Sequence, residues 1–308
     1  MFRVELPASC VEAWDWHARQ GAFERLVPPF DPVRLLSSSG TILEGDSKVL
    51  ALPPFGLRWV ARHGRAERGA LFVDSQERGP FASFVHHHRF APSSEGGCWL
   101  SDELDWRLPL EPASLWIAGR IVRDKLARMF AWRHHVVVHD LAMARALALA
   151  PLRLELAGEG RARGHLAALF DTQGHQIAPP AGLGSGADDV DARMSLEGDA
   201  LLVEPRRGQA VRLASGRILL EPRDLDRPGP WTLLEELAAA ALLAAAGRLA
   251  GGARSVVRLD RPQQASEAPL PALELDGLPP PRWTSRADLA QRLRGRIRAV
   301  EAPQHGTA

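Results

Sequence analysis

The feature that most constrains the fold is a series of short strand-like segments followed by one long helical segment. Apolar and polar residues alternate in several stretches between residues 33 and 110, and loops rich in Gly, Pro, Ser or Asp separate these stretches. Apolar residues then recur at helical spacing across Ala113–Leu147, among them Ile117, Ile121 and Phe130. Because an apolar sheet face must be buried, we expect the long helix to cover it.

The first residues add a strand and two short helices to this pattern. Phe2–Leu6 alternates like a strand, and Ser9 is placed to cap a helix over Ser9–Gln20. A second helix, AFERLV, ends before Pro28 and Pro29. Residues 1–147 therefore predict one α+β domain with an antiparallel sheet.

Several blocks of this domain resemble a known superfamily. GAFERLVPPFDPV, LRWVARH, LFVDSQERGPFASFVHHHRF and LSDELDWRLPL occur in an order that resembles the START-like, helix-grip ligand-binding superfamily (SRPBCC). The nearest branch is the one fused to NAD-dependent epimerase-like domains. The resemblance implies a sheet wrapped around the C-terminal helix, with an apolar cavity that takes a lipid, a quinone or a polyketide-like molecule. Some members are cyclases or dehydratases.

Residues 151–308 resemble a degenerate form of that epimerase domain. LRLELAGEGRARGHLAALFDTQGHQIAPP reads as strand, Gly-rich turn, helix and strand. The GxxGxxG positions of a dinucleotide-binding turn fall on Ala157, Gly160 and Arg163, so only the middle glycine is kept, and a shifted frame recruits Gly158 instead. We interpret Gly158 and Gly160 as the remnant of a cofactor-binding turn in a reduced α/β, Rossmann-like domain. Further helices are predicted over Trp231–Leu249 and Arg286–Val300.

The composition of the chain also argues against redox chemistry in the second domain. The resemblance implies a catalytic Tyr–Lys pair, but the chain contains no Tyr, and its two lysines, Lys48 and Lys125, both lie in the first domain. We therefore expect no NAD(P) cofactor and a second domain without catalytic activity.

The stretch FVHHHRF carries the candidate chemistry of the first domain. Since side chains alternate along a strand, Phe84, His86 and His88 share one face with other apolar residues, and His87 takes the opposite face. A simple hairpin closed by a loop over residues 91–97 places His86 opposite Asp102. A carboxylate on an apolar face needs a partner, and His86 is the obvious one. The preceding strand brings Phe72 or Asp74 near His86.

Several interpretations of these residues stay open. His86 and Asp102 can orient an oxygen of a ligand, act as an acid–base pair in a cyclase or dehydratase, or form a purely structural pair. A metal site built from His63, His86 or His88 with Asp102 is a further alternative, but strands offer two ligands more easily than three, so we expect no metal. The residues expected to line the ligand site are Trp59, His63, Phe84, His86, His88, Asp102 and Trp106.

Charge and hydropathy exclude several other classes of protein. The net charge is +1 with acidic and basic residues interleaved, which argues against a nucleic-acid partner. The first residues lack the basic and apolar regions of a signal peptide, and the longest apolar run, at residues 237–247, is too short to span a bilayer. Two separated cysteines fit a reducing compartment, so we expect a cytoplasmic protein.

The altered glycine turn and the missing Tyr–Lys pair generate the first testable prediction. Calorimetric and fluorescence titrations with NADH and NADPH should detect no binding tighter than about 10 μM. Saturable binding below that value would show that the second domain retains a working nucleotide site.

Overall fold

The computed structural model describes residues 1–28, 33–52, 56–94, 96–179, 190–197, 200–207, 210–215, 228–248, 255–259 and 297–301. The chain divides into two compact units, the first containing Met1–Leu141 and the second beginning at Ala142. The domain boundary expected from the sequence, between residues 147 and 151, remains a prediction. No helix within the described ranges is long and apolar enough to cross a membrane.

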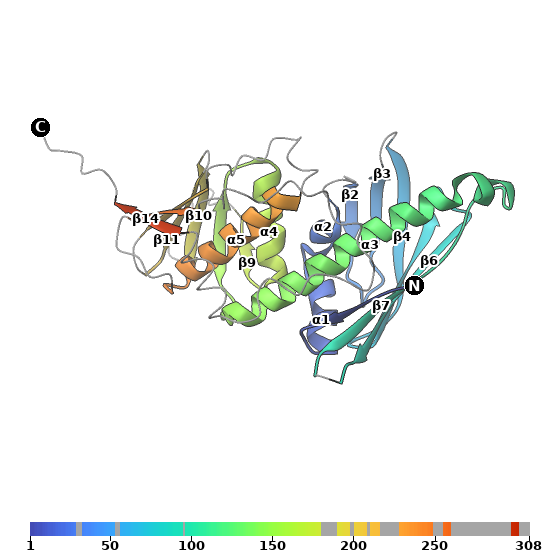
Figure 1. Ribbon diagram of the computed structural model, residues 1–308, viewed down its shortest axis with the longest axis horizontal. Helices are drawn as coiled ribbons and strands as arrows, with labels where there is room; N and C mark the ends of the chain where they lie inside the picture. Colours follow the sequence, from blue (N-terminus) through green and yellow to red (C-terminus); the bar gives the residue numbers. More distant parts are fainter. Residues whose placement is uncertain are drawn as a thin grey trace, which may run out of the picture. The chain divides into compact units, whose positions relative to one another are not determined.

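The first unit is a single antiparallel sheet with helices on one face (Figure 1). The strand order is β1-β7-β6-β5-β4-β3-β2, so the last strand of this sheet, β7, pairs with the first, β1, which forms one edge. The sequence-based α+β assignment is confirmed. The elements are β1 (Phe2–Leu6), α1 (Cys10–Ala18), α2 (Ala22–Leu26), β2 (Arg34–Ser39), β3 (Ser47–Leu52), β4 (Leu57–Glu67), β5 (Leu71–Arg78), β6 (Ser83–Pro92), β7 (Cys98–Arg107) and α3 (Ala113–Leu147).

Local sequence explains where α1 begins. The hydroxyl of Ser9 accepts a hydrogen bond from the backbone N–H of Glu12, and the Glu12 carboxylate accepts one from the backbone N–H of Ser9. This capping box satisfies backbone donors that the first turn of a helix leaves free. The predicted cap at Ser9 is confirmed.

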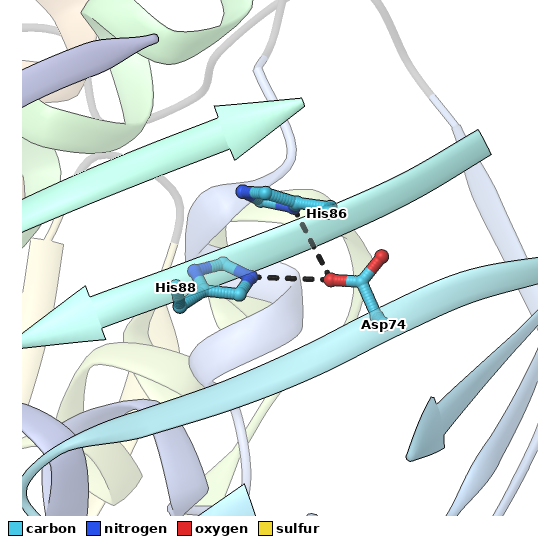
Figure 2. A group of neighbouring side chains, drawn as sticks. All are labelled: Asp74, His86 and His88. Atoms are coloured by element: carbon cyan, nitrogen blue, oxygen red, sulfur yellow. Dashed lines mark hydrogen bonds and ion pairs between the residues drawn. The ribbon is translucent and has the colours of Figure 1, made fainter. Parts of the chain in front are cut away.

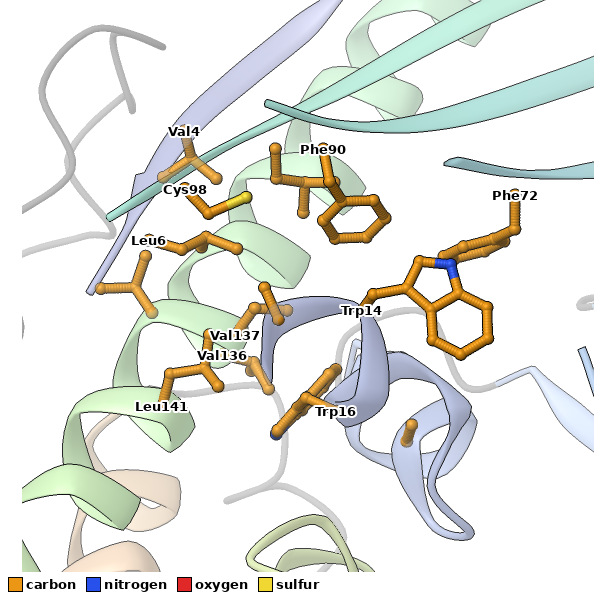
Figure 3. Packing of buried hydrophobic residues seen from close by; sticks show 14 of the residues in the cluster. Val4, Leu6, Trp14, Trp16, Phe72, Phe90, Cys98, Val136, Val137 and Leu141 are labelled. Atoms are coloured by element: carbon orange, nitrogen blue, oxygen red, sulfur yellow. The ribbon is translucent and has the colours of Figure 1, made fainter. Parts of the chain in front are cut away.

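The core of the first unit lies where α1 and the second half of α3 meet the sheet. Trp14 and Trp16 of α1 are almost completely buried. As Figure 3 shows, they lie among side chains of the sheet, including Phe72 and Phe90, and of α3, including Val137. Apolar burial of this kind is the main favourable term in folding, and it fixes α1 and α3 on the same face of the sheet.

Only the C-terminal half of α3 covers the sheet. Phe130 is buried and stacks on Phe2 of β1, with ring centroids 4.7 Å apart. By contrast, Trp116 is 89% exposed, Ile117 70% and Ile121 69%. The expectation that Ile117 and Ile121 belong to the buried stripe is therefore wrong. Helical spacing shows which residues share a face, but not how far along its axis a helix stays in contact with its neighbour.

The register of the β6–β7 hairpin differs from the predicted one by two residues. His88, rather than His86, is opposite Asp102, and His86 is opposite Leu104. β6 runs two residues further than expected, to Pro92, while β7 begins at Cys98 as expected, and the turn closes with a hydrogen bond from Ser93 N–H to Gly97 O. A shift of two residues preserves the face of every side chain, so the predicted inward set is still inward.

Gly97 explains why the hairpin can end so close to β1. A Cβ atom at this position would lie 2.6 Å from the carbonyl oxygen of Leu6. No larger residue fits without moving the backbone of one strand.

The second unit contains the predicted βαβ segment within a mixed sheet. β8 (Arg153–Ala157) and β9 (Gln176–Ala178) are parallel and joined by α4 (Gly160–Thr172). The next strands form an antiparallel meander instead of further βαβ units. The strand order is β14-β13-β12-β11-β10-β8-β9. The remaining elements are β10 (Ala192–Glu197), β11 (Ala200–Pro205), β12 (Val211–Ser215), α5 (Pro228–Ala245), β13 (Ser255–Leu259) and β14 (Ile297–Glu301).

The two helices predicted near the C-terminus have different outcomes. The helix expected over Trp231–Leu249 is present as α5. The basic helix expected over Arg286–Val300 is wrong at its end, because Ile297–Glu301 forms a strand that pairs with β13. Residues 286–296 lie outside the described residues.

A fully buried ion pair joins α2 to α3. Arg25 donates to Asp140 through Nε at 3.0 Å and through a terminal nitrogen at 2.5 Å, and neither side chain is exposed. Arg25→Ala leaves the Asp140 carboxylate buried without this partner, so we expect a loss of about 3–5 kcal/mol in the free energy of unfolding. Urea denaturation followed by tryptophan fluorescence measures it.

The exposed pair of Arg68 with Asp15 provides the control. Arg68 Nε lies 2.7 Å from Asp15, but the arginine side chain is 59% exposed. Arg68→Ala should lower the free energy of unfolding much less than Arg25→Ala does, because solvent screens an exposed ion pair. Equal losses of unfolding free energy in the two variants would show that the buried Arg25–Asp140 pair stabilises the protein no more than an exposed pair does.

Candidate functional site

Three adjacent strands bring two histidines and two carboxylates together on the inner face of the sheet. Asp74 of β5 is opposite His86 of β6, and His88 of β6 is opposite Asp102 of β7. His86, His88 and Asp102 are buried, and the side chain of Asp74 is 21% exposed. These four residues are called the His–Asp cluster below.

Each histidine of the cluster lies between the two carboxylates. Oδ2 of Asp74 is 3.2 Å from Nδ1 of His86 and 3.1 Å from Nε2 of His88 (Figure 2). On the other side, Oδ1 of Asp102 accepts a hydrogen bond from Nε2 of His86 at 2.8 Å. Nδ1 of His88 is 2.9 Å from the same oxygen but is not aligned for a hydrogen bond, so this contact is electrostatic.

The long helix adds a third histidine. His134 of α3 is buried, and its Nε2 lies 2.6 Å from Oδ2 of Asp102. Both oxygens of Asp102 are therefore engaged by histidines from two different elements. The cluster thus ties the sheet to the helix that covers it.

This arrangement stabilises the charged forms of His86, Asp74 and Asp102. Burial by itself would lower the pKa of His86, but the charge of Asp74 and the hydrogen bond to Asp102 outweigh it and raise that pKa to about 9. Burial would raise the pKa of both carboxyl groups, but the charge and hydrogen bonds of nearby histidines hold each well below its usual range. Because both nitrogens of His86 face carboxylates, the doubly protonated imidazolium fits this position.

His17 marks the boundary between the cluster and the apolar core. Its Nδ1–H donates to the carbonyl oxygen of Ala13 at 2.7 Å, and its ring centroid is 6.0 Å from that of His88. Burial, with the nearby charge of His88, lowers the pKa of His17 to about 3. His17 is therefore neutral while His86 is charged.

A group of aromatic side chains lies beyond the cluster on the same sheet face. Phe84 of β6 is buried and is opposite Trp106 of β7, which is half-buried. The ring of Trp59 on β4 is 4.9 Å from that of Phe84, and Phe81 lies near both. Trp59, Phe81, Phe84 and Trp106 are called the aromatic group below.

Two buried donors near these residues have no hydrogen-bond partner within the described part of the chain. They are Nε1 of Trp59 and Nε of Arg133, which precedes His134 on α3. A buried donor without an acceptor costs roughly 1–3 kcal/mol, so each is suited to an acceptor that arrives with a ligand.

His63 does not join the cluster, although its backbone is opposite Asp74. Its Nδ1 instead contacts Asp46, and Lys48 binds the other oxygen of that carboxylate at 2.6 Å. Burial opposes ionisation of Asp46, but the hydrogen bonds from His63 and Lys48 lower its pKa.

The sequence therefore identified part of this site. It predicted that His86, His88 and Asp102 share the inner face, and it named Asp74 as a neighbour of His86. It missed His17 and His134, because helical periodicity does not show which strand residue a helix side chain meets. The one feature of the sequence that could have pointed to His134 is the concentration of histidines in WRHHVVVH, residues 132–139.

One trio in the cluster has the chemical make-up of a metal site. Asp74, His86 and His88 each offer one ligand atom, and these atoms lie within 4.8 Å of one another. The sequence offered two ligands from one strand, and the third comes from the neighbouring strand β5.

The glycine turn of the second unit is shaped by its own packing. Gly158 has φ +111°, and a Cβ atom there would lie 3.1 Å from Cβ of Leu196. Gly160 also has positive φ. Nε of Arg163, at the third glycine position, donates to the carbonyl oxygen of Leu156 at 3.3 Å.

The charged state of His86 predicts how stability changes with pH. Its folded pKa of about 9 exceeds the ordinary 6.5, so its contribution is fully present below pH 6.5 and is lost as the pH rises through about 9. Chelator-treated protein should lose up to about 3 kcal/mol of unfolding free energy across this range. Urea titrations at a series of pH values measure the change.

The matched variants are His86→Gln and His87→Gln. The first should flatten the pH profile above 6.5, and the second should preserve it, because His87 lies on the opposite sheet face. A profile that is already flat in the unaltered protein would show that His86 is not held as an imidazolium.

Comparisons with known proteins found one matching family model and several similar solved structures. Residues 4–132 match the family model for polyketide cyclase/dehydrase and lipid transport proteins. The comparison with curated proteins found no match.

Among solved structures, a nucleoside-diphosphate sugar epimerase from Corynebacterium glutamicum is 26% identical with a TM-score of 0.52. The match covers 77% of this chain and 50% of that one, so the chain spans about half the length of that structure. A protein from Thermus thermophilus is 14% identical over 44% of this chain and 95% of that one, with a TM-score of 0.34. Norcoclaurine synthase from Thalictrum flavum is 13% identical over 44% of this chain and 83% of that one, also with a TM-score of 0.34.

The family match falls on the helix-grip sheet and the first part of its long helix, and thus on all four residues of the His–Asp cluster but not on His134. Residues 4–132 thus match the family model for polyketide cyclase/dehydrase and lipid transport proteins, and the first unit has the antiparallel sheet and long C-terminal helix of the helix-grip fold.

Proposed function

We propose that the first unit binds a hydrophobic small molecule that carries at least one hydrogen-bond-accepting oxygen. The apolar body of the ligand lies against the aromatic group, and its oxygen points toward the His–Asp cluster. The observation that carries this proposal is the placement of both groups on one sheet face. Apolar walls with a few converging polar groups are typical of small-molecule sites.

The strand geometry makes the two groups neighbours. Phe84 and His86 are two residues apart on β6, which separates them by roughly 7 Å along the strand on the same face. Asp74 is the most exposed member of the cluster, and Trp59 and Trp106 are half-buried. The polar and aromatic ends are thus close enough for one molecule of lipid or polyketide size to contact both.

The two unpartnered donors support an acceptor on the ligand. A carbonyl or carboxylate oxygen could accept from Nε1 of Trp59 or Nε of Arg133, which have no acceptor within the described residues. Burial disfavours the charged form of Arg133 and lowers its pKa, while the charges of Asp74 and Asp102 act in the opposite direction. An anionic or strongly polar oxygen near this guanidinium would therefore be favourable.

The open half of α3 supports an entry route. Residues 113–129 of this helix are mostly exposed, and Trp116, Ile117 and Ile121 present apolar surface there. The sealed core lies at the other end, under α1 and the second half of α3. We infer that the ligand enters beside the N-terminal half of α3.

The alternative function is a cyclase or dehydratase reaction. His86 is favoured as its acid because its raised pKa keeps a proton available at neutral pH, with Asp102 holding the ring. His86 is only 2% exposed, so the substrate would have to meet it from the side of Asp74. An NAD(P)-dependent oxidoreductase or epimerase is a weaker alternative.

We propose no catalytic role for the second unit. A phosphate-binding turn must leave room for a ligand beside its backbone. Here Leu196 packs close to Gly158, and the side chain of Arg163 turns back onto Leu156.

A binding experiment with a fluorescent fatty acid tests the ligand proposal. Trp59→Leu removes an aromatic wall and a donor, so it should weaken binding roughly 30-fold, which corresponds to about 2 kcal/mol. Trp99→Leu is the control, because Trp99 lies on the outer face, under the guanidinium of Arg3 at 4.1 Å. Native mass spectrometry of the purified protein would identify a retained ligand.

The outcome is decisive in both directions. Equal loss of fatty-acid binding in the two variants would contradict the proposed site. So would a folded, unaltered protein that neither binds the fatty acid nor retains a ligand on purification.

A further inference from the structure

Two imidazole nitrogens and one carboxylate oxygen converge on one point of the inner sheet face. Nδ1 of His86 and Nε2 of His88 lie 3.2 Å and 3.1 Å from Oδ2 of Asp74 (Figure 2). We propose that Asp74, His86 and His88 bind a first-row transition-metal dication, for which Zn²⁺ is the representative probe.

The distances suit a shared metal ion. Ligand atoms about 2.0–2.1 Å from a tetrahedral zinc ion are roughly 3.3 Å apart. The two measured separations from Oδ2 of Asp74 are within a few tenths of an ångström of this value. The third pair, Nδ1 of His86 and Nε2 of His88, lies within 4.8 Å, so a metal ion bound to all three atoms is compatible with this arrangement.

The second nitrogen of each imidazole faces Asp102. Nε2 of His86 hydrogen-bonds Oδ1 of Asp102 at 2.8 Å, and Nδ1 of His88 lies 2.9 Å from the same oxygen in an electrostatic contact that lacks hydrogen-bond alignment. Histidines that bind metals nearly always direct their second nitrogen at a carboxylate or carbonyl, which fixes the tautomer and the ring orientation. Asp102 would serve both ligands at once, and it is held in turn by His134 at 2.6 Å.

Charge balance also favours a dication. With two neutral histidines, the two carboxylates of the cluster carry two negative charges, which one dication neutralises. Binding of a dication therefore leaves no uncompensated charge in this buried site. Imidazole ligands favour zinc, iron or cobalt over magnesium and calcium, which prefer oxygen ligands.

Three protein ligands leave at least one coordination position open. Asp74, the member that is 21% exposed, lies on the accessible side. The site could therefore polarise an oxygen of a bound molecule. This inference goes beyond the proposed function and does not depend on it, since the protein ligands are complete without any hydrophobic molecule.

Metal titration of the full chain, free of any affinity tag and treated with a chelator, tests the proposal. Calorimetry with Zn²⁺ alone should give one strong site per chain, with a dissociation constant at or below about 10 μM. Asp74→Asn and His88→Gln should each weaken that binding at least about 100-fold. Asp102→Asn should weaken it about 10- to 100-fold, because it removes support and not a ligand.

His87→Gln is the matched control. His87 lies between the two ligands in sequence but on the opposite face of β6, so a folded site predicts an unchanged affinity. A histidine triplet that binds metal as a flexible peptide would instead lose affinity in this variant as much as in His88→Gln, and that result would overturn the proposal.

Two further readouts keep the test independent of folding and of the ligand. The visible absorption of bound Co²⁺ reports its ligands, and the Co²⁺ spectrum should change in Asp74→Asn while circular dichroism shows a folded chain. Folded, unaltered protein without a strong Zn²⁺ site would refute the inference. Failure of the fatty-acid experiment with intact Zn²⁺ binding would count against the proposed function alone.

Discussion

The carboxylate of Asp102 is the group on which the architecture of the site depends. It lies on an otherwise apolar sheet face with almost no solvent contact, where an unpaired charge would be very unfavourable. His86 and His134 satisfy its two oxygens, and they come from a strand and from the covering helix. The need to neutralise one buried charge therefore fixes how β6, β7 and α3 meet.

The cluster lies at a transition along the sheet face. On one side is the sealed apolar core formed by α1 and the second half of α3, and His17, held neutral by burial, borders it. On the other side, Phe84 and the half-buried Trp59 and Trp106 lead toward the exposed first half of α3. A charge-paired cluster between the apolar core and the aromatic group suits the polar end of the apolar ligand proposed above.

The same geometry suits two kinds of occupant at the cluster. A proton on His86 pairs with Asp74 and Asp102, and the proposed dication would pair with the same two carboxylates. An ordinary buried salt bridge needs only one donor for a carboxylate oxygen. At this cluster, two ring nitrogens converge on the same oxygen of Asp74. In the second unit, Leu196 packs close to Gly158 of the glycine turn, and Arg163 donates to the carbonyl oxygen of Leu156.

Local sequence patterns determined the elements of the first unit and the faces of its strands. Ser9 and Glu12 mark the start of α1, alternation places His86, His88 and Asp102 inward, and the helical repeat over Ala113–Leu147 matches α3 in full. Composition alone also limited the chemistry of the second unit, because a chain without tyrosine cannot form a Tyr–Lys acid–base pair.

Only the tertiary structure decided which of these residues meet. The β6–β7 register differs from the predicted one by two residues, and His63 contacts Asp46 instead of joining the cluster. Asp74 of β5 offers a third ligand atom, and His134 of α3 contacts Asp102. The physical reason is that a period of two fixes the face of a strand residue but not its partner, which depends on where the turn closes. The contact between a helix residue and the sheet depends further on the position and crossing of the whole helix, which packing across the core sets and local sequence does not.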